Sequence, residues 1–210
     1  MALVFSTKAR TLDSLKGVLS SAQIAPLFFF SVEQWCSSKT ECLSKISAAF
    51  GSSSLIIRSS CGREDAVNSS NAGAFLSLPN VDHSNLEVSI DKVIASYGDA
   101  DPADEVLVQP MLTDVIRSGV AFTHDPNTCS PYRVVNWSDG NDTSTVTSGA
   151  GGSIWQQAAN CSISPPSIFV PIISLLNELL ELYDHIPLDC EFSLTCDGNN
   201  QILWLLQVRP

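Results

Sequence analysis

The sequence predicts an α+β protein of two lobes, and three observations carry this prediction. Segments with apolar residues at helical spacing alternate with short apolar runs that are typical of buried strands. The 210 residues, 44% of them hydrophobic, suffice for two small cores. A turn-rich acidic stretch, GDADPADE, divides the chain. We therefore expect an N-terminal lobe at residues 1–104 and a C-terminal lobe at residues 105–210, with a ligand in the cleft between them.

The expected N-terminal lobe combines helices, strands and one long loop. Its helices are expected at residues 9–21, 40–50 and 86–97, and its strands at residues 27–32 and 55–59. The polar, small-residue stretch SSCGREDAVNSSNAGAF follows the second strand and predicts a long loop.

The expected C-terminal lobe is richer in strands. We expect strands at 105–111, 119–123 and 132–137, a helix at 168–183, and a final hairpin of strands 189–194 and 202–208. The stretch DGNN at residues 197–200 makes this pair the clearest hairpin signal in the chain.

The composition excludes several classes of function. A net charge of -11 argues against binding nucleic acid or an anionic membrane, which both require clustered Lys and Arg. The seven cysteines form no CxxC pair, which fits reduced, mostly buried thiols better than disulfides or zinc. The sequence shows no signal peptide and no apolar run of transmembrane length, so we expect a cytoplasmic protein.

The terminal hairpin can be read as a chemical site from strand geometry. Residues two apart in a strand share a face, so Asp189 and Glu191 point one way, and Gln207 and Arg209 share a face of the second strand. A turn centred on Asn199 would place Glu191 opposite Gln207 and Asp189 opposite Arg209.

This arrangement would suit a magnesium-bound phosphate. Carboxylate and amide oxygens are ligands that Mg²⁺ accepts, which makes Glu191 and Gln207 the candidate metal pair. Arg209 would clamp a phosphate, and Asp189 would contribute to the site or only orient Arg209. The alternative is a solvated polar face with an ordinary ion pair, and a register shift of one residue would remove the arrangement.

Four segments of the chain resemble motifs of a known family and occur in the same order as in that family. IIRSSCGREDAVNSSNAGAF resembles the "V-R-S-S-x-x-x-E-D … A-G" segment of phosphoenolpyruvate synthase and pyruvate phosphate dikinase. EVLVQPMLTDVIRSGVAFTHDP is similar to "VQ-x-M-V … SGV-x-FT-x-DP", and PLDCEF with ILWLLQVRP is similar to "DIE(F/W) … LQ-x-RP". STKARTL resembles the "GxKxxxL" opening without its Gly. The stretch VVNWSDGNDTSTVTSG is closer to the branch of amino-acid and sugar kinases such as L-glutamine kinase.

The resemblance implies an ATP-grasp fold that binds ATP and Mg²⁺, and it assigns roles to further residues. Arg58 would contact the ATP phosphates and, with Arg209, act in catalysis. Lys8 would add a second cation, although ordinary solvation is an equal alternative. Gly73 would belong to a mobile lid whose backbone approaches the phosphates.

The resemblance also places the adenine and two further phosphate contacts. The strand 108–111 would meet adenine, and because Pro110 lacks an N–H, the Gln109 carbonyl and the Met111 N–H are the candidate partners. Arg117 and Thr123 could face phosphate. A P-loop is disfavoured because the chain has no Gly-Lys-Ser/Thr.

The implied activity is a phosphotransfer that this sequence does not complete. In the family, the ATP-grasp domain passes a phosphoryl group to a histidine on a separate swivelling domain and yields AMP and phosphate. None of His83, His124 and His185 lies in a Gly-rich "SH" context, so we expect the acceptor elsewhere in a longer chain or on a partner. The alternatives are a module that binds nucleotide without turnover and a degenerate structural module.

Overall fold

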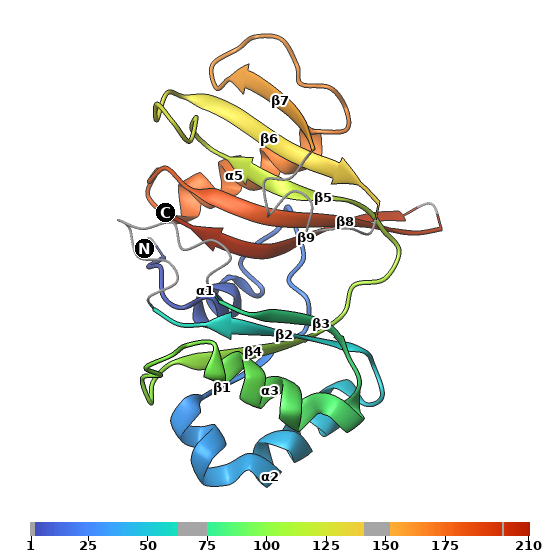
Figure 1. Cartoon of the computed structure of the whole chain (residues 1–210). Helices are drawn as coiled ribbons and strands as arrows, with labels where there is room; N and C mark the ends of the chain where they lie inside the picture. Colours follow the sequence, from blue (N-terminus) through green and yellow to red (C-terminus); the bar gives the residue numbers. More distant parts are fainter. Residues whose placement is uncertain (1–2, 63–74, 141–151, 199) are drawn as a thin grey trace. The chain divides into compact units, whose positions relative to one another are not determined.

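A computed structural model describes residues 3–62, 75–140, 152–198 and 200–210 (Figure 1). The described chain divides into two compact units, each with one antiparallel sheet. The four-stranded unit comprises residues 6–13 and 25–111, and the five-stranded unit comprises the described residues of 1–5, 14–24 and 112–210. The strand 105–110, which we expected to open the C-terminal lobe, lies in the four-stranded unit and pairs with two of its strands.

The four-stranded unit packs two helices on one face of its sheet. The strand order is β1-β4-β2-β3. Its core joins Ile57 and Val108 of the sheet to Trp35 and Ile90 of the helices. The elements are α1 (Lys8–Leu15), β1 (Phe28–Ser31), α2 (Val32–Phe50), β2 (Leu55–Ser60), β3 (Ser77–Val81), η1 (His83–Asn85), α3 (Leu86–Ala95) and β4 (Glu105–Pro110).

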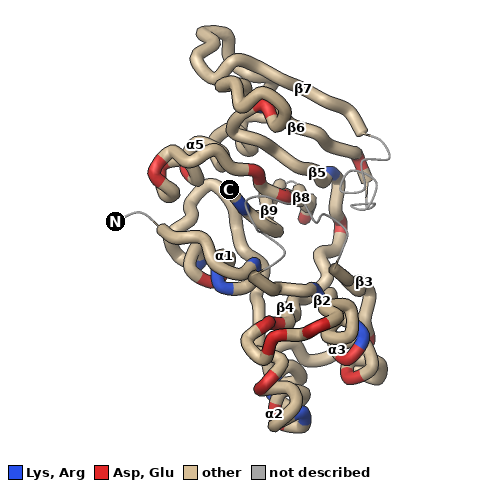
Figure 2. Tube along the Cα trace, turned by 60° about the vertical axis from the view of Figure 1, so that its left-hand side comes forward, with Lys and Arg blue, Asp and Glu red and all other residues tan. Residues whose placement is uncertain are grey.

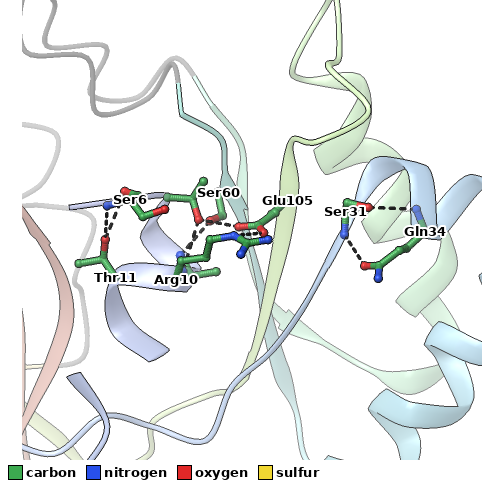
Figure 3. Close-up of polar contacts among 9 residues, drawn as sticks. Ser6, Arg10, Thr11, Ser31, Gln34, Ser60 and Glu105 are labelled. Carbon is green, nitrogen blue, oxygen red and sulfur yellow. Dashed lines mark hydrogen bonds and ion pairs between the residues drawn. The ribbon is translucent and has the colours of Figure 1, made fainter. Parts of the chain in front are cut away.

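Helix α2 begins eight residues before the start at Thr40 that its apolar spacing predicted. Ser31 and Gln34 form a capping box, in which the Ser31 side chain accepts from the Gln34 N–H and the Gln34 side chain accepts from the Ser31 N–H (Figure 3). A non-helical residue, Ser38, kinks the helix and breaks its apolar periodicity. The S-x-x-Q spacing was therefore the signal for this helix start.

Among the described residues of the five-stranded unit, the helix α5 covers one face of the sheet. The strand order is β7-β6-β5-β8-β9. Phe169, at the start of α5, packs its ring on Trp137 and Trp155, with ring centroids 4.8 Å and 4.7 Å away. The elements are β5 (Val115–Phe122), β6 (Tyr132–Asp139), β7 (Ser153–Ala158), α5 (Val170–Leu182), β8 (Asp189–Asp197) and β9 (Asn200–Arg209).

Strand β5 is longer than we expected because its glycine lies inside the strand. Gly119 pairs with Trp137 on β6 and Phe192 on β8. A Cβ at this position would lie 2.1 Å from the Asn136 carbonyl oxygen. The strand therefore begins at Val115 and not at the expected Gly119, and glycine allows the close approach of β5 and β6.

All seven cysteines are free thiols, but only three of them are buried, namely Cys42, Cys61 and Cys190. Burial raises the pKa of the Cys190 thiol far above its ordinary value. Within the described residues, no helix is long and apolar enough to cross a membrane.

Candidate nucleotide site

The predicted pairing of the terminal hairpin is confirmed. Asp189 lies opposite Arg209, and Glu191 lies opposite Gln207. Because paired residues share a face, all four side chains leave the same face of the five-stranded sheet. The opposite face carries Cys190 and Val208, both buried.

A β-bulge in β9 produces this register. Near the turn, the pairs run from Asp197 with Asn200 to Phe192 with Leu205, one residue out of step with the site pairs. The shift falls between Phe192 and Glu191, so Leu206 is the additional residue on β9. Without the bulge, Glu191 would face Leu206, and the polar side chains of the two strands would point to opposite faces.

Asp189 and Arg209 form a two-point ion pair on this face. Arg209 Nε donates to Asp189 Oδ1 at 2.9 Å and to Oδ2 at 3.0 Å. Both side chains are largely buried, with 17% and 26% of their surface exposed. Asp189 therefore holds the guanidinium near the end of β9, which matches the orienting role considered for it.

The candidate metal pair offers one carboxylate and one amide. Gln207 is buried, and Glu191 is partly exposed on the neighbouring strand. Cross-strand neighbours have Cβ atoms about 5 Å apart, so one cation could contact both side chains. The described residues contain no group of three or more His, Cys, Asp or Glu side chains suited to a metal, so water and phosphate oxygens would have to complete a Mg²⁺ shell here.

Arg117 and Thr123 lie on β5 and just after it, but neither matches its expected role closely. Arg117 belongs to the face opposite Glu191, and its guanidinium pairs with Asp139 at 2.7 Å. Thr123 is fully buried, and its hydroxyl both donates to the Leu188 carbonyl and accepts from the Leu188 N–H. Thr123 thus extends the strand pairing, and a phosphate would have to compete for a hydroxyl already engaged.

The four-stranded unit brings two predicted cations to one region. Arg58 lies on β2 with 8% of its surface exposed, and Lys8 opens α1 with 3% exposed. Lys8 Nζ donates to the carbonyl of Ser59, the residue after Arg58, at 3.4 Å. Figure 2 shows cationic segments on α1 and at β2. Register places Arg58 on the sheet face opposite the core residues Ile57 and Val108.

A buried carboxylate that we did not single out fastens the start of α1. Glu105 of β4, with a side chain 2% exposed, accepts from the Thr7 hydroxyl at 2.5 Å. It also accepts from Arg10 Nε at 2.7 Å (Figure 3). Ser60 of β2 accepts from the Ala9 N–H at 2.8 Å. Alternation along EVLVQP places Glu105 on the same face as Gln109, which was the available sequence signal.

One of the two groups expected to contact adenine, the Met111 N–H, already has a hydrogen-bond partner within the sheet. The Met111 N–H donates to the Ser54 carbonyl at 2.9 Å, so this donor continues the pairing of β4 with β2. The Gln109 side chain, which is distinct from the carbonyl expected to meet adenine, is buried and donates to the Ala25 carbonyl at 3.5 Å. Gly73 lies outside the described residues.

The predicted residues are thus shared between the two units. The five-stranded unit brings Asp189, Glu191, Gln207 and Arg209 together on one face, whereas the four-stranded unit brings Lys8 close to Arg58. Their roles in binding stay predictions. No protein-family model matches the sequence. No curated protein matches it either.

Comparison with solved structures gives several matches across nearly the whole chain. PH1788 from Pyrococcus horikoshii Ot3 covers 97% of this chain and 89% of its own, with a TM-score of 0.54 and 11% identity. The dinucleotide-forming acetyl-coenzyme A synthetase 1 of Ca. Korarchaeum cryptofilum covers 97% and 91%, with a TM-score of 0.54 and 10% identity. D-alanyl-alanine synthetase A from Vibrio cholerae covers 95% of this chain at a TM-score of 0.50 and 14% identity.

The chain spans about half (52%) of the length of the Vibrio synthetase. Identities this low show the fold and not the activity. The two units and their antiparallel sheets, together with these neighbours, show that the chain has the α+β, two-lobed ATP-grasp fold.

Proposed function

We propose that this chain is the Mg-ATP-binding domain of a phosphoenolpyruvate-synthase-like phosphotransferase. Of the phosphoryl groups of ATP, one would go to a histidine on a separate domain and one to water, so that AMP and phosphate are the products. The observation that carries the proposal is the bulged hairpin, which sets Glu191 beside Gln207 and Asp189 beside Arg209 on one face. The four motif segments that resemble this family supply the rest of the support.

The proposed chemistry rests on charge stabilisation and positioning. Glu191 and Gln207 would hold Mg²⁺, which in turn would bind phosphate oxygens. Arg209, already held by Asp189, would stabilise charge on the transferred group without reorganising. Arg58 and Lys8 would supply further positive charge to the phosphates.

The fold neighbours agree with a nucleotide ligand. The acetyl-coenzyme A synthetase was solved in complex with coenzyme A and Ca-AMPCP, which pairs an adenine nucleotide analogue with a divalent cation. The name of the Vibrio protein is that of a synthetase, so its reaction class differs from the one proposed here. The motif resemblance, and not the fold, favours the phosphotransferase.

The acceptor histidine would be supplied by another domain, in the same polypeptide or in a partner. His124 contacts the Thr123 hydroxyl through Nδ1 at 3.0 Å, and burial lowers its pKa below the ordinary value. His185 is exposed on the loop after α5 and lies 3.7 Å from Glu181. These are ordinary structural surroundings for histidine.

The decisive experiment measures ATP binding by calorimetry with and without Mg²⁺. We expect Glu191→Ala to weaken Mg-ATP binding at least about tenfold, because a cation ligand is lost. Glu181→Ala, which removes an exposed carboxylate of the same unit, serves as the matched control and should bind like the wild type. If the affinity for ATP were unchanged without Mg²⁺ and in Glu191→Ala, the assignment of Glu191 as a metal ligand would be refuted.

The reaction is tested by adding a phosphohistidine domain of this enzyme class and following the nucleotide products. AMP and phosphate are the expected products. Mg-ATP binding without turnover would favour a nucleotide-binding module, and formation of ADP with an added carboxylate and amine would favour a ligase. Absence of any ATP binding would favour a degenerate structural module.

A further inference from the structure

Three buried polar atoms on the strands of the five-stranded sheet have no hydrogen-bond partner among the described residues. They are Ser118 Oγ on β5, Ser193 Oγ on β8 and Asn136 Oδ1 on β6. The two serines expose only 2% and 1% of their surface. A buried polar group without a partner destabilises the folded protein, so three of them in one sheet require an explanation.

The three side chains share the face that carries the candidate metal pair. Ser118 lies directly opposite Ser193, and two residues further along β5, Val120 lies opposite both Asn136 and Glu191. Residues two apart share a face, so the serine pair and the Glu191 row lie on the same side of the sheet. Figure 1 shows β5 between β6 and β8, the strands that supply the other members.

Three cross-strand pairs of polar side chains follow one another along this face, in rows that match the order of outer phosphates and then sugar in a nucleotide. The ion pair of Asp189 and Arg209 comes first, the pair of Glu191 and Gln207 second, and the pair of Ser118 and Ser193 third. Successive rows are about 7 Å apart. With the outer phosphates at the metal pair and Arg209, the next row away from Arg209 meets the sugar.

The chemistry of the three atoms also fits a sugar better than a phosphate. Phosphate oxygens only accept hydrogen bonds at neutral pH, which would satisfy the serine hydroxyls but not Asn136 Oδ1. Ribose hydroxyls both donate and accept, so they can pair with all three atoms. The absence of a charged group in this set is consistent with a neutral hydroxyl ligand.

We propose that Ser118 and Ser193, together with Asn136 Oδ1, bind the ribose hydroxyls of the nucleotide. This inference rests on the proposed Mg-ATP site and adds a subsite to it. The serine pair forms the centre of the subsite, and Asn136 borders it diagonally on β6.

The test compares four ligands by calorimetry in the presence of Mg²⁺: ATP, 2′-deoxy-ATP, 3′-deoxy-ATP and inorganic triphosphate. The wild type should bind ATP about tenfold more tightly than at least one deoxy analogue, the gain from one or two buried hydrogen bonds. Ser118→Ala and Ser193→Ala should each weaken ATP by several-fold, leave that deoxy analogue nearly unchanged and leave triphosphate unchanged. Ser174→Ala, on the exposed side of α5, is the matched control.

The outcomes separate this inference from the proposed function. Equal loss of ATP and triphosphate in the serine variants would assign the serines to phosphate and overturn the ribose subsite. Equal affinity of the wild type for ATP and both deoxy analogues would also overturn it, while the Mg-ATP site would stand. A wild type that binds none of the four ligands would overturn the proposed function itself. Thermal melting of each variant shows that the fold is retained.

Discussion

Each unit has an antiparallel sheet with buried polar side chains on one face, but the two units differ in whether those side chains are hydrogen-bonded. In the four-stranded unit, Ser60 and Glu105 are buried and receive hydrogen bonds from the start of α1. In the five-stranded unit, Ser118 and Ser193 are equally buried, and no described residue bonds their hydroxyls. The first face contributes to stability, whereas the second carries a cost that a bound polar ligand would relieve.

The largest expected effect concerns the contact between two strands of the five-stranded sheet, β5 and β6. Gly119→Ala would place a methyl group 2.1 Å from the Asn136 carbonyl oxygen, so β5 and β6 must move apart. We expect a loss of more than about 3 kcal/mol in the free energy of unfolding, measured by urea denaturation. Gly198→Ala, where nothing lies within 4 Å of the added methyl but φ is +60°, should cost only about 1 kcal/mol. Equal losses would show that the strand contact at Gly119 is not decisive.

The second effect tests whether the polar face of the four-stranded unit is structural. Glu105→Ala removes the acceptor of Thr7 and Arg10, and we expect a loss of about 2 kcal/mol in the free energy of unfolding. Glu105→Gln keeps the shape and one bond and should lose about half as much. Arg10→Ala should lose less than about 1 kcal/mol because its side chain is 61% exposed. If Arg10→Ala matched Glu105→Ala, the ion pair alone would hold α1.

The sequence predicts the five-stranded face better than it predicts the four-stranded one. Alternation in two adjacent strands is a local property, and together with the assumed turn centre at Asn199 it gave the observed pairing of Glu191 with Gln207. The expected turn centre, Asn199, lies outside the described residues, and the pairs next to it are one step out of the assumed register. The bulge at Leu206 shifts the register back, so that Glu191 pairs with Gln207 as expected. No local feature of ILWLLQVRP predicts this bulge.

The bonds at the start of α1 could not be predicted in the same way. Thr7 and Glu105 lie 98 residues apart, so their contact depends on the placement of α1 over the sheet. The same is true of Met111, whose N–H is engaged by Ser54 because β4 continues its pairing past Pro110. In each case the residue type indicated a possible role. Which of these groups already had a hydrogen-bond partner depended on how distant segments of the chain pack together.

A third, pH-dependent effect concerns the carboxylate that holds an N-terminal segment in the five-stranded unit. Glu178 of α5 accepts from the N–H groups of Ser20 and Ser21, each at 2.8 Å. Burial alone would raise the pKa of Glu178, but hydrogen bonds from Ser21 and Ser20 outweigh it, so the pKa lies below its ordinary value. The stabilisation is therefore complete above the pKa of the unfolded chain, 4.5, and is lost as the pH falls through the lower pKa of the folded protein.

Glu178→Gln should therefore lower the free energy of unfolding by about 1 kcal/mol at pH 7, and the difference from the wild type should shrink toward pH 3. Thermal melting at several pH values measures this. The control is Glu181→Gln, one turn away, with a side chain 74% exposed. A difference that stays constant across this range would mean that the charge of Glu178 does not contribute.

The smallest effect has the opposite sign and decides the comparison. Ser193→Ala removes a buried hydroxyl without a described partner, so the ligand-free protein should be unchanged or up to about 1 kcal/mol more stable. Ser60→Ala, an equally buried serine of the other unit, leaves the Ala9 N–H without its acceptor and should cost about 1 kcal/mol. Urea denaturation of both variants without nucleotide measures the difference. If the two substitutions cost the same, the hydroxyl of Ser193 is as well satisfied as that of Ser60, and the polar face of the five-stranded sheet has no unmet hydrogen bonds for a ligand to fill.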